Sequence, residues 1–128
     1  MTYIVITPDI IAISESKLNN NSNCNDIQLH GYTFVNKNSL TQAGGVGIYV
    51  KINLIYKIRS DLNLHNDHIE DIWLDVTDVS DTSILVSALY SHLNNNTKHF
   101  GEILENLFNY LAILILTLYL KTLWTNSL

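Results

Sequence analysis

The sequence predicts a mixed α/β domain of the α+β kind, in which a series of short strands is followed by one helix. Two observations predict this class. Apolar, β-branched runs separated by loops rich in Asn, Asp and Gly recur up to about residue 90, and the apolar spacing changes to a helical period near residue 100. The expected strands lie near residues 3–6, 9–14, 32–36, 46–51, 54–59, 71–77 and 83–90, and the expected helix near residues 97–112.

The strand expected at residues 9–14 is the most informative element. Residues 10–13 are apolar and mostly β-branched without alternation, which is typical of a strand buried on both faces of a layered sheet. Glu15 follows this run, and functional side chains often lie on the loops that leave such strands. Glu15 is therefore a candidate metal ligand. A polar, Asn-rich connection at residues 19–26 leads to the next strand.

Turn residues and the apolar period support the middle elements. A glycine pair at residues 44–45 marks a turn into the next strand. Residues 72–76 alternate with a period of two, so that Asp75 is expected to face solvent. Asp71 and Asp78 are expected at solvent-facing or turn positions as well. The side chains expected to face the core in this strand are Ile72, Leu74 and Val76.

The expected helix follows an Asn run and has Thr97 as a candidate N-cap. Its apolar residues recur at i, i+3, i+4, i+7, i+8 and i+11, a spacing typical of a helix that covers a sheet. These residues are Phe100, Ile103, Leu104, Leu107, Phe108 and Leu111. Beyond residue 111 the amphipathic pattern is lost.

Composition indicates one globular unit that is poorly equipped for free-standing nucleic-acid binding. A length of 128 residues suits a single domain, and 47% hydrophobic with 15% charged residues lies outside the disordered range. The net charge is −5 and Arg59 is the single arginine, whereas affinity for nucleic acid scales with the phosphates neutralised. The lone Cys24 excludes an intrachain disulfide. Because no signal-peptide pattern opens the chain, we expect an intracellular location, in nucleus or cytoplasm.

Five blocks carry a resemblance that runs in order along the chain. They are Pro-Asp-Ile-Ile-Ala-Ile-Ser-Glu-Ser-Lys-Leu at residues 8–18, Gly-Tyr-Thr-Phe at 31–34, Gly-Gly-Val-Gly-Ile-Tyr-Val-Lys at 44–51, Glu-Asp-Ile-Trp-Leu-Asp-Val at 70–76, and the strand at 84–90. Together they resemble the endonuclease/exonuclease/phosphatase family, specifically the endonuclease domain of non-LTR retrotransposons. The resemblance covers residues 8 to about 111. It implies a four-layer α/β/β/α sandwich with mixed, mostly antiparallel sheets, which cleaves DNA phosphodiesters with Mg²⁺.

The resemblance also implies roles for three residues. Glu15 matches the family's metal-binding glutamate, and Tyr90 matches its phosphate-contacting tyrosine. Asn94 stands where the family places a substrate-contacting asparagine, although the block here reads Tyr-Ser-His-Leu-Asn without the family's proline. Glu70 recurs in the family's block without an assignable catalytic role, so we interpret it as structural.

Several family segments have no counterpart in the sequence, which therefore reads as a single partial domain over residues 1–128. The family's first, Asn-bearing strand is expected upstream of Pro8, its Gly-Asp-Phe-Asn block is replaced by apolar residues 111–120, and its Ser-Asp-His segment is missing. Residues 112–128 form an atypical apolar tail. One carboxylate does not hold Mg²⁺ firmly, because this ion is normally bound by one or two carboxylates together with substrate phosphates. We therefore expect no independent cleavage.

Other interpretations of the same residues stay open. His65 and His68 beside an aspartate could suggest zinc, but a solvated loop explains them more simply. His92 or His99 could replace the missing base, but nothing in the sequence orients either ring. The apolar run at residues 107–120 suggests a membrane-associated, tail-anchored protein, although it is shorter than the ~20 residues of a spanning helix. Uncovered sheet edges suggest self-association or a non-catalytic partner-binding role.

Overall fold

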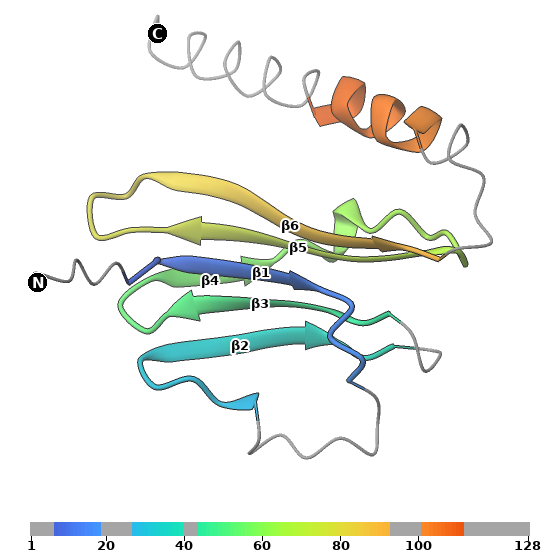
Figure 1. Ribbon diagram of the computed structural model, residues 1–128. Coiled ribbons are helices and arrows are strands. Elements are labelled where there is room, and N and C mark those ends of the chain that lie inside the picture. The colour runs from blue at the N-terminus through green and yellow to red at the C-terminus, as the bar shows by residue number, and fades with distance from the viewer. Residues whose placement is uncertain (1–6, 19–26, 40–43, 93–100, 112–128) are drawn as a thin grey trace, which may run out of the picture. The chain divides into compact units, whose positions relative to one another are not determined.

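The structure is a computed structural model that describes residues 7–18, 27–39, 44–92 and 101–111. The chain divides into two compact units, Met1–Leu93 and Asn94–Leu128. The first unit carries all the described strands (Figure 1). In the second unit, residues 101–111 are helical. No helix within the described parts of the chain is both long and apolar enough to cross a membrane.

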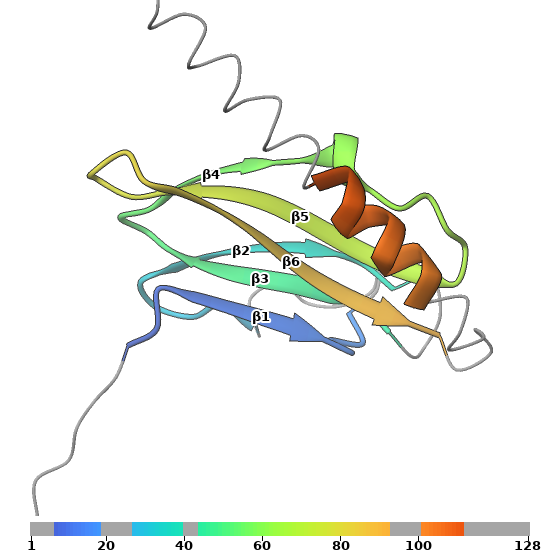
Figure 2. The same ribbon diagram turned by 90° about the horizontal axis from the view of Figure 1, so that it is seen from above.

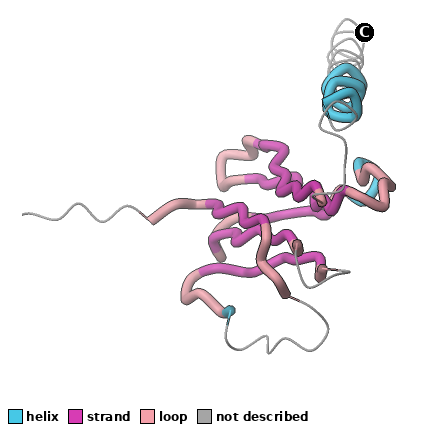
Figure 3. Tube along the Cα trace, turned by 45° about the vertical axis from the view of Figure 1, so that its right-hand side comes forward, coloured by secondary structure: helices cyan, strands magenta, loops and turns pink. Residues whose placement is uncertain are grey.

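The described strands of the first unit form two antiparallel three-stranded sheets (Figures 1 and 3). The first sheet has the order β1-β3-β2, and the second has the order β4-β5-β6. The strands are β1 (Ile10–Ser14), β2 (Tyr32–Lys37), β3 (Val46–Lys51), β4 (Ile55–Ile58), β5 (Ile69–Thr77) and β6 (Ser83–Ser91). A short 3-10 turn, η2 (Ser60–Leu62), follows β4.

The two sheets pack face to face around an aliphatic core. β6 lies over β1 and β3, and β5 lies over β2 and β3, as the view from above shows (Figure 2). Because side chains alternate along a strand, every second residue of the two central strands points into the interface. The core residues from these strands are Val46, Ile48, Val50, Ile72, Leu74 and Val76. The hydrophobic pattern of β3 and β5 thus fixes which faces of the two sheets meet.

A tight turn sets the register of the β5–β6 hairpin. The carboxylate of Asp78 accepts hydrogen bonds from the Ser80 hydroxyl at 2.7 Å and from the Thr82 amide at 3.0 Å. The bond from the Ser80 hydroxyl is the main cause that holds the pKa of Asp78 below its ordinary value. From this turn the ladder runs back to place Tyr90 directly opposite Glu70. The turn therefore decides which polar side chains meet at the far end of the hairpin.

The structure confirms the α+β class and six of the expected strands, with shifts of one or two residues at their ends. Ile72, Leu74 and Val76 are buried as expected, and Asp75 keeps 34% of its side chain exposed. The described part of the expected helix, residues 101–111, is helical. The strand expected at residues 3–6, the candidate cap Thr97, and the tail at 112–128 lie outside the described residues.

Two expectations about burial are wrong. β1 is not buried on both faces, because the described strands cover only one face of its sheet, and Ala12 and Ser14 are exposed. Asp71 is not solvent-facing, since only 2% of its surface is exposed. Its Oδ2 accepts hydrogen bonds from the Trp73 indole at 2.8 Å and from the Leu64 amide at 2.9 Å. The segment that follows β4 contacts this part of β5, so Asp71 is buried with its polar partners.

Candidate functional site

The candidate site lies where β1 and β6 both end, on one side of the sandwich (Figure 1). Glu15 directly follows β1, is exposed, and has a φ of 55° in the left-handed region. Its neighbours hold it there, because the Ser16 amide donates to the Gly45 carbonyl at 3.0 Å and the Lys17 amide donates to the Gly44 carbonyl at 2.7 Å. A left-handed non-glycine residue is strained, and such residues cluster at functional sites.

The glycine pair connects this loop to the second sheet. Gly44 has a φ of 107° and Gly45 a φ of 88°, which are conformations that other residues rarely adopt. A Cβ on Gly44 would overlap the Glu70 carboxylate and lie 3.1 Å from the Tyr90 ring. A Cβ on Gly45 would overlap the Ser16 hydroxyl. The turn therefore lies between the loop that follows β1 and the part of the second sheet where β5 begins and β6 ends.

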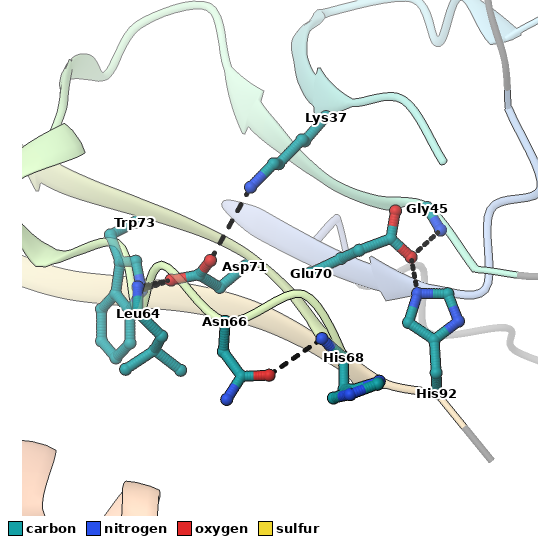
Figure 4. A network of polar contacts seen from close by, with 9 residues as sticks. All are labelled: Lys37, Gly45, Leu64, Asn66, His68, Glu70, Asp71, Trp73 and His92. Carbon is teal, nitrogen blue, oxygen red and sulfur yellow. Dashed lines mark hydrogen bonds and ion pairs between the residues drawn. The ribbon is translucent and has the colours of Figure 1, made fainter. Parts of the chain in front are cut away.

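Glu70 is the buried polar centre of the site, with only 3% of its surface exposed (Figure 4). Its Oε2 accepts a hydrogen bond from the Gly45 amide at 3.2 Å and lies 3.1 Å from Nε2 of His92. Its Oε1 is buried without a hydrogen-bond partner among the described residues. A buried carboxylate is costly unless it is paired and hydrogen-bonded, so the Gly45 amide and the His92 ring are its main compensation.

Tyr90 and His92 stand next to each other at the end of β6. Their rings pack edge to face with centroids 5.1 Å apart and an interplanar angle of 83°. The His92 amide donates to the His68 carbonyl at 2.9 Å, which continues the hairpin ladder past the last residue of β6. The His92 side chain is thus fixed by its backbone, by Tyr90 and by Glu70, and 18% of it remains exposed.

A second polar network adjoins the site on β5. Lys37 of β2 places its Nζ 3.8 Å from Oδ1 of the buried Asp71 (Figure 4).

Arg59 forms ion pairs with two carboxylates, at 2.8 Å from Asp61 and 3.0 Å from Asp75. The hydrogen bonds with Asp61 and then Asp75 raise the pKa of Arg59 further, and the bond with Arg59 lowers the pKa of Asp61. The single arginine is therefore neutralised locally rather than displayed to a phosphate backbone.

Two of the three expected site residues, Glu15 and Tyr90, are described, and they come from different sheets. The backbone of Ser16 and Lys17, next to Glu15, is hydrogen-bonded to the Gly44–Gly45 turn, and the Tyr90 ring lies close to Gly44. Asn94 lies outside the described residues, as does His99. His65 and His68 are both exposed on the loop before β5, in agreement with the solvated-loop interpretation.

Sequence reasoning missed Glu70 and the orientation of His92. Glu70 was interpreted as structural, and His92 as a ring that nothing orients. A usable signal was present, because pairing the strands outward from the Asp78 turn sets Glu70 opposite Tyr90 and leaves His92 just beyond the hairpin. The contact of Glu70 with Gly45 depends on the packing of the two sheets, and no local sequence pattern predicts it.

The described residues do not form a complete magnesium site. Nowhere in residues 7–18, 27–39, 44–92 or 101–111 do three His, Cys, Asp or Glu side chains gather so that they could hold a metal ion. Glu15 offers an exposed carboxylate, whereas Oε2 of Glu70 is already engaged by Gly45 and His92. Mg²⁺ usually takes one or two carboxylates together with water and phosphate oxygens. Glu15 can thus supply one ligand of such a site and no more.

Comparison with models of protein families, with curated proteins and with solved structures finds no match for this chain.

Proposed function

We propose that the chain is part of a metal-dependent phosphodiesterase domain similar to the endonucleases of non-LTR retrotransposons, and that it does not cleave DNA alone. The observation that supports this most concerns the Gly44–Gly45 turn: the two residues that follow Glu15 are hydrogen-bonded to it, and the Tyr90 ring lies against Gly44. In the resembled family the positions of Glu15 and Tyr90 contact metal and phosphate. The two packed sheets would be the inner layers of a four-layer sandwich whose outer helices cover both faces.

The proposed inactivity follows from the chemistry of phosphodiester cleavage. The reaction needs a fixed cation, an activated water in line with the leaving group, and donors for the charge that develops on phosphate. Glu15 supplies one metal ligand, and the sequence has no counterpart of the Gly-Asp-Phe-Asn block that handles the water and the transition state. Catalytic groups that act as a unit fail together, so partial sites retain little activity.

Plasmid nicking tests the proposal directly. Supercoiled DNA is incubated with the purified chain in Mg²⁺, in Mn²⁺ and in excess chelator, and the relaxed form is quantified by gel electrophoresis. We expect no nicking above the buffer control in any condition. Metal-dependent nicking by the native chain that disappears in Glu15→Gln would show that the fragment is a working nuclease and would overturn the proposed inactivity.

The genomic surroundings test the family assignment. Translating the flanks of the coding region in all frames is expected to yield an upstream Asn-bearing strand and a downstream Gly-Asp-Phe-Asn block. Flanks that encode neither segment in any frame would count against descent from such an endonuclease.

A second candidate function is partner binding through an open sheet edge. Among the described strands, β6 has β5 alone as its neighbour, and its nine residues include no charge and no proline, whereas natural edge strands usually carry such protective features. Ile84 and Leu85 on this strand are 52% and 39% exposed. Light scattering after size-exclusion chromatography should then show an oligomer that Leu85→Lys converts to monomer. A native chain that is already monomeric at high concentration would exclude self-association through β6.

A further inference from the structure

We infer that Glu70 and His92 form a carboxylate–imidazole dyad that holds His92 as an oriented proton acceptor next to the Tyr90 ring. Its assignment to a catalytic site rests on the proposed function, whereas the dyad itself rests on contacts within the β5–β6 hairpin. The resemblance assigns the base to a histidine of a segment that has no counterpart in the 128 residues. His92 is thus a different residue from the family's base and comes from a different element.

Glu70 is the member of the dyad whose side chain is held in place by the surrounding structure. It sits on the central strand of its sheet and has 3% of its surface exposed. The Gly45 amide anchors Oε2 at 3.2 Å, and the absence of a side chain on Gly44 leaves the room that the carboxylate occupies. The other oxygen, Oε1, is buried without a hydrogen-bond partner in the described part of the chain, so the carboxylate relies on the His92 ring for compensation.

His92 is the member of the dyad that can accept a proton. Its Nε2 lies 3.1 Å from Oε2 of Glu70, and Tyr90 supports the ring from the side. Figure 4 shows Nε2 directed at the carboxylate and the other ring nitrogen directed away from it. With Nε2–H donated to Glu70, the lone pair lies on Nδ1, which is the nitrogen available to a water or hydroxyl.

The chemistry of the pair follows from this arrangement. A water or hydroxyl that loses its proton gives it to Nδ1, and the resulting imidazolium keeps its Nε2–H on Glu70, whose negative charge offsets the positive charge of the ring. No other bond is made or broken in this step. A carboxylate that fixes the tautomer of a histidine and compensates its charge is the orienting group of known catalytic triads. Glu70 is in this sense a positioning residue for His92.

Nitrogen NMR of the histidine rings tests the dyad without metal or DNA. The full chain labelled with ¹⁵N-histidine is examined by long-range ¹H–¹⁵N correlation in mildly alkaline solution, where neutral tautomers are distinguished. We expect His92 to show a single Nε2–H tautomer with an unprotonated Nδ1, and Glu70→Gln to lose this single signature. Glu102→Gln, a carboxylate on the helix of residues 101–111, is the matched control and should leave His92 unchanged.

The outcomes separate the dyad from the proposed nuclease ancestry. A His92 spectrum that matches the exposed His65 and His68, or that shows Nδ1–H, would overturn the dyad even if Glu70→Gln failed to fold, because the native chain alone gives this reading. The spectra do not depend on Mg²⁺ or DNA, so a failure of the proposed function would leave them unchanged. A confirmed dyad in a chain whose flanks encode no nuclease segments would place the proton acceptor in a different reaction.

Discussion

Replacing Gly44 by alanine is expected to destabilise the fold more than the same change at another left-handed glycine. Gly44 has a φ of 107°, and an added Cβ would overlap the Glu70 carboxylate and lie 3.1 Å from both the Ser39 hydroxyl and the Tyr90 ring. Gly31 is the matched control. It has a φ of 85°, but a Cβ there would meet nothing within 4 Å.

The expected magnitude has two parts. Forcing alanine into such a backbone conformation costs about 1–3 kcal/mol, and this part is common to both substitutions. At Gly44 the new methyl group also pushes the Glu70 carboxylate away from the Gly45 amide and the His92 ring. Leaving buried polar groups unsatisfied costs roughly a further 1–3 kcal/mol. Gly44→Ala should therefore lose about 1–3 kcal/mol more than Gly31→Ala.

Urea unfolding of the single and double variants measures both parts. Because Glu70→Ala removes the atoms that the methyl group strikes, Gly44→Ala should cost less in that background, with a coupling energy of about 1–3 kcal/mol. Equal losses for Gly44→Ala and Gly31→Ala would refute the reasoning. Additive changes in the free energy of unfolding for Gly44→Ala and Glu70→Ala would refute it as well, since they would show that the added methyl group does not contact the carboxylate.

Three further predictions concern the core, the hairpin turn and the site loop. Leu74→Ala, at a residue with 0% exposure, should lose about 2–5 kcal/mol in urea unfolding, whereas Ile84→Ala, at 52% exposure, should change stability little. The pKa of Asp78 is lowered in the fold, so its contribution is present above the unfolded value of 3.8 and is lost as pH falls through the lower folded value. Melting temperatures should accordingly depend less on acid pH in Asp78→Asn, and an unchanged acid profile would contradict this. Glu15→Gly should raise stability by about 1 kcal/mol because the φ of 55° is unfavourable for glutamate, while Glu15→Gln should not.

Local sequence patterns were enough to predict the strands and the central core. The alternation of Ile72, Leu74 and Val76 gave the inward face of β5, and the glycine pair at residues 44–45 gave the turn before β3. These features depend on neighbours in the sequence, and period and turn chemistry report them directly.

Features that depend on sheet order and packing could not be predicted in the same way. The apolar run of β1 suggested burial on both faces, but only one face of its sheet is covered by the other described strands. Asp71 is buried because a segment from the β4–β5 connection supplies it with a donor. Glu70 becomes a site residue only because the Gly45 amide of the other sheet reaches its carboxylate. Each of these contacts joins elements whose relative position no single pattern fixes.

Paramagnetic NMR with Mn²⁺ at millimolar concentration tests the central claim, that Glu15 is a single, weak metal ligand at a partial site shared by the end of β1 and the end of β6. In ¹H–¹⁵N spectra of the chain titrated with Mn²⁺, we expect selective broadening at Ser14, Ser16, Gly44, Gly45 and Tyr90. Excess Mg²⁺ should reverse the broadening, and Glu15→Gln should abolish it. Broadening that is centred on Asp61 or Asp78, that persists in Glu15→Gln, or that is absent at millimolar Mn²⁺ would contradict the claim.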